Sequence, residues 1–385
     1  MKYLVKILPA LVILFASFSS MAGGDEQDTA YVFEAVYDVE TTAVKDQHRS
    51  GTCWDFASLS FLESELIRAG KGHHDLSEMF IINRTYPRKA EFYVRYHGKA
   101  NFGPGGQGHD AIYVIGHYGI VPEEIYQGIE YGEEKHNHGE LDAVLQGMLD
   151  AVVKKRGGKI TPKWNEAVQE VVDVYLGEVP ESFEFDGEIY TPISYAESLG
   201  LEPDQYIELT SYNHHPFYEQ FILEVPDNWS NDLYYNVPLD DLIKVMDHAL
   251  EEGYTIMWDG DVSDKFFSHK DGVAIVPAKT WADKSEAEKK NSCKIPEAQK
   301  AVDQQMRQEA FDSQTATDDH LMHIVGLYKD QNGDKYYKTK NSWDSDSNDH
   351  GGFLYMSEPY VKHNTLAIMI HKDALPKGIE KKLGL

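Results

Sequence analysis

The chain has 385 residues and a formal net charge of −28, since 36 lysines and arginines stand against 64 aspartates and glutamates. An acidic chain without a basic run is a poor partner for nucleic acids, whose phosphates are bound by clustered lysine and arginine. A hydrophobic content of 42% excludes overall disorder and only two cysteines exclude a disulfide framework, so we expect a folded globule without a membrane span.

The first 22 residues have the features of a secretory signal peptide. An apolar run follows Lys2 and Lys6 and extends to Phe18, and small residues occupy the positions around a cleavage point. The run is too short to span a bilayer, which leaves an ordinary buried helix as the alternative. No cysteine stands near the cleavage point, so we expect a protein exported to the periplasm or the exterior without a lipid anchor, with residues 23–385 as one domain.

The spacing of apolar residues predicts mainly helices up to residue 251. Residues 31–46 alternate loosely and indicate extended chain, whereas apolar residues recur every three or four positions from Cys53 to Ala69, where Gly70 supplies a stop. Further helices are expected at His109–Tyr118, Leu141–Lys154, Trp164–Leu176, Pro192–Gly200 and Leu239–Glu251. Because the segment of about residues 127–190 is polar and charged, we interpret it as a helical insertion.

The last quarter of the chain is rich in short β-type runs. They occupy Met322–Tyr328, Lys335–Lys340 and Gly352–Met356. Residues 330–333 (Asp-Gln-Asn-Gly) between the first two predict a hairpin turn. The same segment begins like a calcium-binding loop, but its glycine is misplaced and no glutamate follows at position twelve.

Cys53 is the strongest candidate for a nucleophile. It stands at the predicted first turn of a helix, where the positive end of the helix dipole favours a thiolate, the form of cysteine that attacks carbonyls. Gln47, six residues earlier, offers a side-chain amide to an oxyanion, with the backbone N–H of Cys53 as the second donor. The alternative is a buried, inert cysteine.

A nucleophilic cysteine needs a histidine and a group that orients it. His320 stands at the head of one predicted strand and Asn341 at the end of its hairpin partner, which would place the two side by side. Asn341 would hold the imidazole ring while remaining uncharged. Trp343 would shield this bond from water and border the substrate.

These motifs resemble those of the papain-fold cysteine peptidases. The spacing from Gln47 to Cys53-Trp54 matches the oxyanion glutamine and the nucleophile of that family, and His320 stands six positions before Gly326, as the catalytic histidine does. Asn341-Ser342-Trp343 resembles the motif that orients this histidine. His323 matches no catalytic position, and we interpret it as a packed core histidine.

The sequence also departs from the papain pattern. Ser50 replaces a disulfide cysteine, and Asp344 replaces the glycine after Asn-Ser-Trp. The interval from Cys53 to His320 is far longer than the roughly 130–150 residues usual in papain and the cathepsins.

The long interval is similar to that of one branch, the bleomycin hydrolase and aminopeptidase C group. Four further segments resemble it: Gly105-Gly106-Gln107, Tyr118–Pro122, Tyr235–Leu239 and Gly253–Val262. Gly105 and Gly106 would let a peptide substrate lie along bare backbone and form main-chain hydrogen bonds, the alternative being a loop that merely turns. In this group a carboxy-terminal arm lies in the cleft, and its carboxylate meets the free amine of the substrate. Residues 377–385, which follow Pro376, form a shorter segment than we expect for such an arm.

The resemblance implies an α+β, papain-like fold, with a helical subdomain packed on a β-barrel-like subdomain. It implies peptide hydrolysis through a thioester on Cys53, without a cofactor, by an aminopeptidase. An endopeptidase and a catalytically silent peptide-binding homologue are the alternatives. The oligomeric state stays open, a homo-oligomer included.

The remaining histidine and cysteine clusters predict no metal site. The pairs at 73–74, 136 and 138, and 214–215 lack the helical spacing and the carboxylate partners of a zinc site. Cys293 lies in a lysine-rich polar stretch and is interpreted as a bystander.

Overall fold

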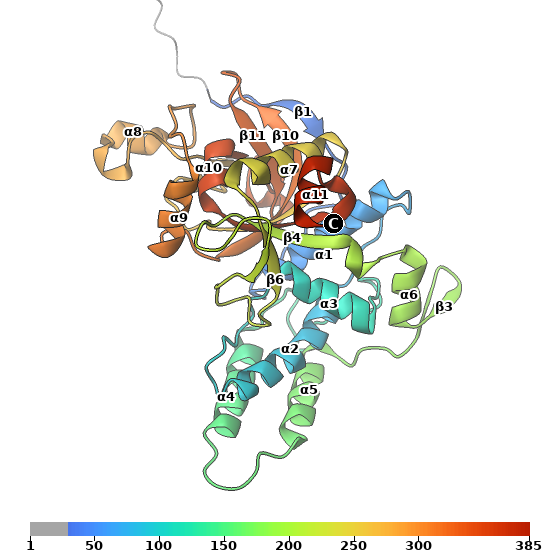
Figure 1. The fold of residues 1–385 in the computed structure, drawn as a ribbon. Coiled ribbons are helices and arrows are strands. Elements are labelled where there is room, and N and C mark those ends of the chain that lie inside the picture. Colours follow the sequence, from blue (N-terminus) through green and yellow to red (C-terminus); the bar gives the residue numbers. More distant parts are fainter. Residues whose placement is uncertain (1–29) are drawn as a thin grey trace, which may run out of the picture.

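The computed structural model describes residues 30–385, so the predicted signal peptide lies outside the described residues. The chain forms a sheet-rich half, in the upper part of Figure 1, and a helical half below it. The α-helices are α1 (Cys53–Arg68), α2 (Glu78–Arg95), α3 (Gly108–Tyr118), α4 (Gly139–Val153), α5 (Lys163–Leu176), α6 (Pro192–Leu199), α7 (Leu239–Glu251), α8 (Glu286–Asn291), α9 (Gln304–Asp312), α10 (Glu358–Asn364) and α11 (Lys377–Leu383). Between residues 30 and 385, no helix combines the length and apolar character needed to cross a membrane.

One large mixed sheet organises the upper half. Its strands are β1 (Glu34–Asp38), β4 (Tyr206–Thr210), β5 (Gln220–Ile222), β6 (Leu233–Asn236), β7 (Ile256–Gly260), β8 (Phe267–Ser268), β9 (Val273–Ala274), β10 (His320–Lys329), β11 (Lys335–Lys340), β12 (Phe353–Ser357) and β13 (Thr365–His371). The order is β5-β6-β4-β13-β7-β10-β11-β12-β9-β8, with β1 paired to β10, and most neighbours are antiparallel. A separate hairpin joins β2 (Phe183–Phe185) and β3 (Glu188–Tyr190).

Two large hydrophobic cores lie within the described chain, and the first of them joins the two halves. The first lies among α1 to α6 and reaches the sheet through Met257, Leu321 and Met369, and the second lies between the sheet and α7, α10 and α11. Helix α1 packs along β10, so its first turn and the beginning of β10 meet at the boundary of the two halves. Apolar residues at three- and four-residue spacing, such as Phe56, Leu59 and Leu62, are buried on α1, because this helix is covered by both halves.

Most of the predicted helices and strands are present, with ends that differ by at most two residues. The helices expected near 53, 109, 141, 164, 192 and 239 correspond to α1 and to α3–α7, and the hairpin turn joins β10 to β11. In this turn the carboxylate of Asp330 accepts hydrogen bonds from the backbone N–H groups of Asn332 and Asp334, which explains its calcium-loop appearance. Helix α2 was not predicted, because Pro87 inside it interrupts the helical pattern.

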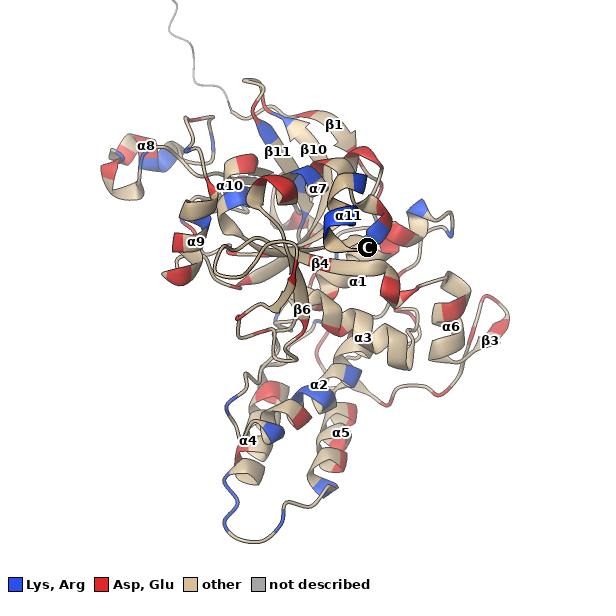
Figure 2. Ribbon diagram, in the orientation of Figure 1, with Lys and Arg blue, Asp and Glu red and all other residues tan. Residues whose placement is uncertain are grey.

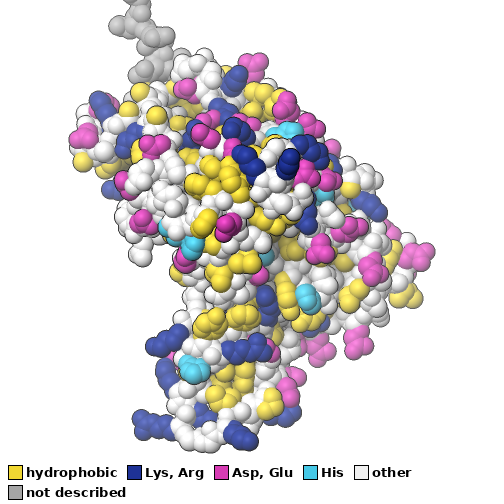
Figure 3. Space-filling model, viewed as in Figure 1, with side chains coloured by type: hydrophobic (Ala, Val, Ile, Leu, Met, Phe, Trp, Pro, Cys, Tyr) yellow, Lys and Arg dark blue, Asp and Glu magenta, His cyan; other side chains and the backbone are white. Residues whose placement is uncertain are grey.

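The segment predicted as an insertion contains α4, α5 and the small hairpin. Helices α4 and α5 pack against α2 and project away from the sheet in Figure 1. The loop that joins them carries Lys155, Arg156 and Lys159, so the far end of this arm is basic in an acidic chain (Figures 2 and 3).

Candidate active site

Cys53 occupies the first position of α1, as predicted, and is partly exposed. The preceding residue, Thr52, is fully buried, and Gly51 has a φ of +70°, a left-handed conformation that favours glycine at this sharp entry to the helix. Among residues 30–385 no hydrogen bond engages the backbone N–H of Cys53. The first turn of the helix therefore presents both a thiol and a free N–H at one point.

His320 and Asn341 lie side by side at the beginning of β10 and just after the end of β11. The Nε2 atom of His320 is 2.7 Å from Oδ1 of Asn341. The same oxygen accepts a hydrogen bond from the backbone N–H of Ser342 at 2.8 Å, which identifies it as the oxygen of the amide. His320 therefore carries its proton on Nε2, and Nδ1 is left as a proton acceptor.

The ring of Trp343 covers the His320 ring, with centroids 4.8 Å apart. Trp343 also contacts His269, a residue that the sequence analysis did not identify, at 4.9 Å. His269 accepts a hydrogen bond from Nδ2 of Asn341 at 3.2 Å and donates to Ser347 at 2.7 Å. The amide that orients His320 is thus held from both ends.

Gln47 is tied to the same loop. Its Oε1 accepts a hydrogen bond from the Ser342 hydroxyl at 2.6 Å, and its backbone N–H donates to the Ser342 carbonyl at 2.9 Å. These contacts leave the side-chain N–H groups of Gln47 available for an acceptor. Asp344 closes the loop with a φ of +72°, a conformation that favours glycine and that aspartate also tolerates, which accounts for the departure from the family motif at this position.

Cys53 and His320 meet where α1 contacts β10. The backbone N–H of Leu321, the residue after His320, lies near the Cys53 thiol and lowers its pKa, but burial dominates and raises this pKa to about 12, with Asp318 and other carboxylates adding to the effect. Burial likewise lowers the pKa of His320 to about 4, against the hydrogen bond to Asn341. Burial thus opposes the thiolate that the start of the helix favours, and it also opposes protonation of His320.

Gly105 and Gly106 form a glycine strip that lies beside Trp54, the residue after Cys53. Trp54 donates a hydrogen bond to the carbonyl of Pro104 at 2.8 Å, and a Cβ on Gly106 would come within 2.9 Å of the Trp54 ring. Only glycine fits there without displacing the ring. Among residues 30–385 no hydrogen bond engages the backbone of Gly106, so its N–H and carbonyl are available for pairing.

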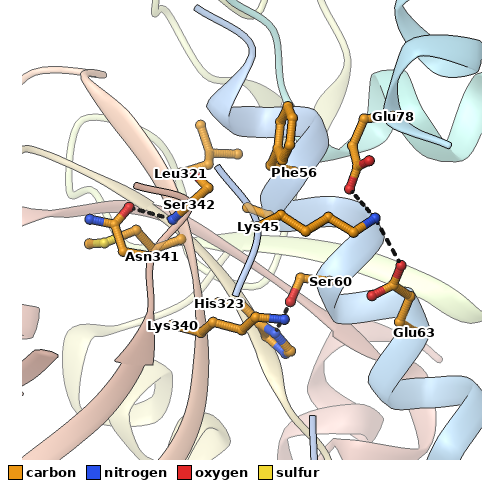
Figure 4. A pocket seen from close by; sticks show the side chains of 12 residues that line it. Lys45, Phe56, Ser60, Glu63, Glu78, Leu321, His323, Lys340, Asn341 and Ser342 are labelled. Atoms are coloured by element: carbon orange, nitrogen blue, oxygen red, sulfur yellow. Dashed lines mark hydrogen bonds and ion pairs between the residues drawn. The ribbon is translucent and has the colours of Figure 1, made fainter. Parts of the chain in front are cut away.

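A small polar pocket lies beside the candidate site, lined by Asn341 and Ser342 on one side and by Glu78 of α2 on the other (Figure 4). Lys45 contacts the buried carboxylates of Glu78 at 2.7 Å and Glu63 at 3.4 Å, and Lys340 lies on the opposite side. His323 also lines this pocket, and its Nδ1 is 2.9 Å from the Ser60 hydroxyl. His323 is thus a packed core histidine as predicted, although its Nε2 has no hydrogen-bond partner within the described chain.

Two minor predictions have different outcomes. Cys293 is buried beside Phe266, and burial raises its pKa to about 12, as fits an inert thiol. The prediction that the histidines at 214 and 215 lack a carboxylate partner is wrong: Glu224 contacts His214 at 3.1 Å and His215 at 2.9 Å. The sequence could not reveal this contact, because it joins the loop between β4 and β5 to the segment that follows β5.

The comparisons with known proteins agree with this geometry. The model of the Peptidase C1-like family matches residues 88–384. Aminopeptidase G of Lactobacillus delbrueckii is 22% identical over 90% of this chain and 84% of its own length, and Aminopeptidase C of Lactococcus lactis is 22% identical over 88% and 82%. The crystal structure of PepW from Lactobacillus rhamnosis has a TM-score of 0.71 at 18% identity, covering 91% of this chain and 84% of that one.

The fold is that of the papain-like proteases, and the chain is a cysteine peptidase. It belongs to the Peptidase C1-like family. The family model begins after Gln47 and Cys53, but the alignments with the two aminopeptidases span about nine-tenths of the chain.

Proposed function

We propose that the chain hydrolyses peptide bonds through a thioester on Cys53. His320 takes the thiol proton on Nδ1 as sulfur attacks the carbonyl, and returns it to the leaving amine. Asn341 orients His320, and the developing oxyanion accepts hydrogen bonds from the Gln47 amide and the Cys53 N–H. A water molecule then cleaves the thioester. The observation that carries this proposal is the linked arrangement of His320, Asn341, Ser342 and Gln47 around the start of α1.

We infer that the substrate is a peptide with a free amino terminus, bound along Gly105 and Gly106. The aminopeptidase names of the relatives support this inference. A second candidate, endopeptidase cleavage, is favoured by one observation: α11 packs on α7 through Ile379 and Leu383, and Lys382 bonds Asp241, so residues 377–383 do not fill the cleft.

The test is hydrolysis of a free-amine aminoacyl amide and of its N-blocked counterpart. Cys53→Ala is expected to lower turnover by several orders of magnitude and to leave the unfolding temperature nearly unchanged, whereas Cys293→Ala retains activity. Preference for the free amine supports an aminopeptidase, and preference for blocked peptides an endopeptidase. A folded chain without turnover on either substrate would indicate a silent peptide-binding homologue.

We also propose that residues 1–22 direct export and are removed. The supporting observation is the charged start followed by a short apolar run. Expression of the full chain should yield a mature protein in the exported fraction beginning near residue 23. Uncleaved protein in the cytoplasm would contradict this proposal.

A further inference from the structure

Three aspartates surround the substrate side of the candidate site. Asp318 precedes His320 by two residues, and Asp259 on β7 pairs with Leu321, the residue after His320. Asp227 lies against the glycine strip, since a Cβ on Gly105 would come within 2.0 Å of its carboxylate. All three carboxylates raise the pKa of the Cys53 thiol by their charge, which places them within electrostatic range of the nucleophile.

The polar groups at the centre of this cluster are buried, and one acceptor among them has no partner. Asp259 is fully buried and is hydrogen-bonded to Asp318, and burial together with the charge of Asp318 raises the pKa of Asp259 well above its usual value. Gln107, also fully buried, donates from Nε2 to Asp318 at 2.9 Å, while its Oε1 has no hydrogen-bond partner within residues 30–385. An unpaired buried acceptor is unfavourable, and here it points to a missing donor.

The two cationic side chains near the cluster already donate their hydrogen bonds to backbone carbonyls. Lys89 donates to the carbonyls of Gly103 and Gly105, and Arg307 donates to the carbonyls of Ser211, Lys362 and Leu366. Neither forms an ion pair with the three aspartates. Within residues 30–385 no lysine or arginine therefore forms an ion pair with these three carboxyl groups, and Asp227 accepts a hydrogen bond from the neutral side chain of Asn101.

The cluster is reached from a cleft of about 410 Å³. Asp318 lines this cleft together with the apolar side chains of Phe311, Leu366 and Val225, and Asp227 follows the wall residue Pro226. A group that enters the cleft thus passes apolar walls and meets Asp318, which stands two residues before His320.

We propose that Asp227, Asp259 and Asp318 form a subsite that binds a positively charged group of the peptide substrate. This inference rests on the proposed function. The charged group is an ammonium or guanidinium: the free α-amine of the substrate, or a lysine or arginine side chain upstream of the cleaved bond. Such a cation supplies the hydrogen-bond donor that Gln107 lacks. The three aspartates would then take the role that the chain carboxylate has in the bleomycin hydrolase group.

The test compares matched substrates on the mature enzyme and on Asp318→Asn and Asp259→Asn. One pair is a leucine amide with a free and with an acetylated amine; the other is an acetylated dipeptide amide with lysine or norleucine in its first position. The variants should raise KM at least about tenfold for the charged member, the usual effect of losing a charge-assisted hydrogen bond, and less than about twofold for the neutral one. Asp312→Asn is the control, because Asp312 also lines the cleft but lies at its exposed edge.

The outcomes separate the sources and the hypotheses. An effect confined to the free-amine pair assigns the α-ammonium, and an effect confined to the lysine pair assigns the side chain. Equal effects on charged and neutral substrates, or no more effect than Asp312→Asn, would overturn the subsite while leaving the proposed hydrolysis intact. If Asp259→Asn fails to fold, the partly exposed Asp318→Asn decides.

Binding to Cys53→Ala provides an independent measurement. Leucinamide and lysinamide are titrated calorimetrically into Cys53→Ala and into Cys53→Ala carrying Asp318→Asn. Binding that is lost with Asp318, together with absence of hydrolysis in the protein that retains Cys53, would retain the subsite and reject the proposed function.

Discussion

At the scale of single residues, Ser342 joins the two parts of the candidate site. Its backbone N–H fixes the Asn341 oxygen that bonds His320, and its hydroxyl fixes the Gln47 oxygen. One residue thus positions both the base and the oxyanion donor. The hydroxyl acts only on Gln47, which makes its removal a selective change.

We predict that Ser342→Ala lowers kcat roughly tenfold with little change in KM, since Gln47 loses its clamp but keeps its donor. Gln47→Ala should cost about 10²–10³ in kcat, as removal of an oxyanion donor does elsewhere. Steady-state kinetics measure both, with Ser345→Ala, an exposed neighbour, as the control. Equal activity of Ser342→Ala and Ser345→Ala would remove Ser342 from the positioning role.

The pH dependence follows from the burial of His320. Its pKa is lowered to about 4, and the imidazole accepts a proton only above that value. For a neutral, N-blocked substrate, kcat/KM should therefore fall about tenfold per pH unit below pH 4 and stay level up to neutrality. Asp318, whose pKa is raised to about 7 mainly by burial, titrates within this range, so the profile is repeated with Asp318→Asn. A midpoint near 6.5 in both proteins would show that His320 titrates as in water.

The residues to which we assign the chemistry could be identified from the sequence, whereas the residues that surround them could not. Cys53, His320 and Asn341 stand in local motifs whose spacing has a mechanistic meaning. His269 and Asp259 carry no such signal, because they reach the site only through pairing of distant segments, such as that of β7 with β10. Asp318 stands two positions before His320, and this short spacing was the one indication in the sequence that it lies near the site.

At the scale of elements, the extended segment before α1 is fixed by a buried ionic contact. Lys45 donates to the Leu76 carbonyl and to two glutamates, one on α1 and one on α2. Burial and the neighbouring Glu63 raise the pKa of Glu78 to about 7, and Lys45 opposes this shift. The lysine thus connects the Gln47 segment to both helices.

We predict that Lys45→Met lowers the free energy of unfolding by about 3–5 kcal/mol, because it leaves two buried carboxylates without their cation. Denaturant unfolding at pH 7.5 measures the loss, which should shrink near pH 5, where Glu78 accepts a proton and no longer needs the lysine. Lys135→Met is the control, since Lys135 forms an exposed ion pair with Asp46 and its removal should change stability little. A loss as small as that of the control would mean that water already solvates the glutamates.

Helix α2 shows why element prediction fails at particular places. Pro87 removes one helical hydrogen bond, so a local pattern suggests two short pieces. Tyr86 and Tyr93 on either side of it are buried against the insertion and donate to Asp142 and Asp150 of α4. Packing against residues more than fifty positions away therefore maintains the helix, and no local pattern contains that contact.

At the scale of the whole molecule, the position of the last helix, α11, determines whether the carboxy-terminal segment can occupy the substrate cleft. Helix α11 lies on α7, with Ile379 and Leu383 buried in the core of the sheet half, and Lys382 contacts Asp241 and Tyr218. These contacts hold the segment by packing. The family resemblance alone suggests an arm in the cleft, because it considers only where the segment stands in the chain. It does not consider the local amphipathic pattern, which determines how the segment packs.

We predict that removal of residues 377–385 destabilises the protein without changing the ratio of free-amine to N-blocked hydrolysis. Each buried aliphatic side chain stabilises by about 1.5–3 kcal/mol, so the truncated protein should unfold at a lower temperature. Ile379→Ala and Leu383→Ala, which keep the full length, should reproduce much of this loss. Kinetics of both substrate types are measured below the lowered unfolding temperature. A changed ratio of free-amine to N-blocked hydrolysis in a folded, truncated enzyme would place the tail in the cleft during catalysis. The free amine would then be bound by the tail and not by the three aspartates.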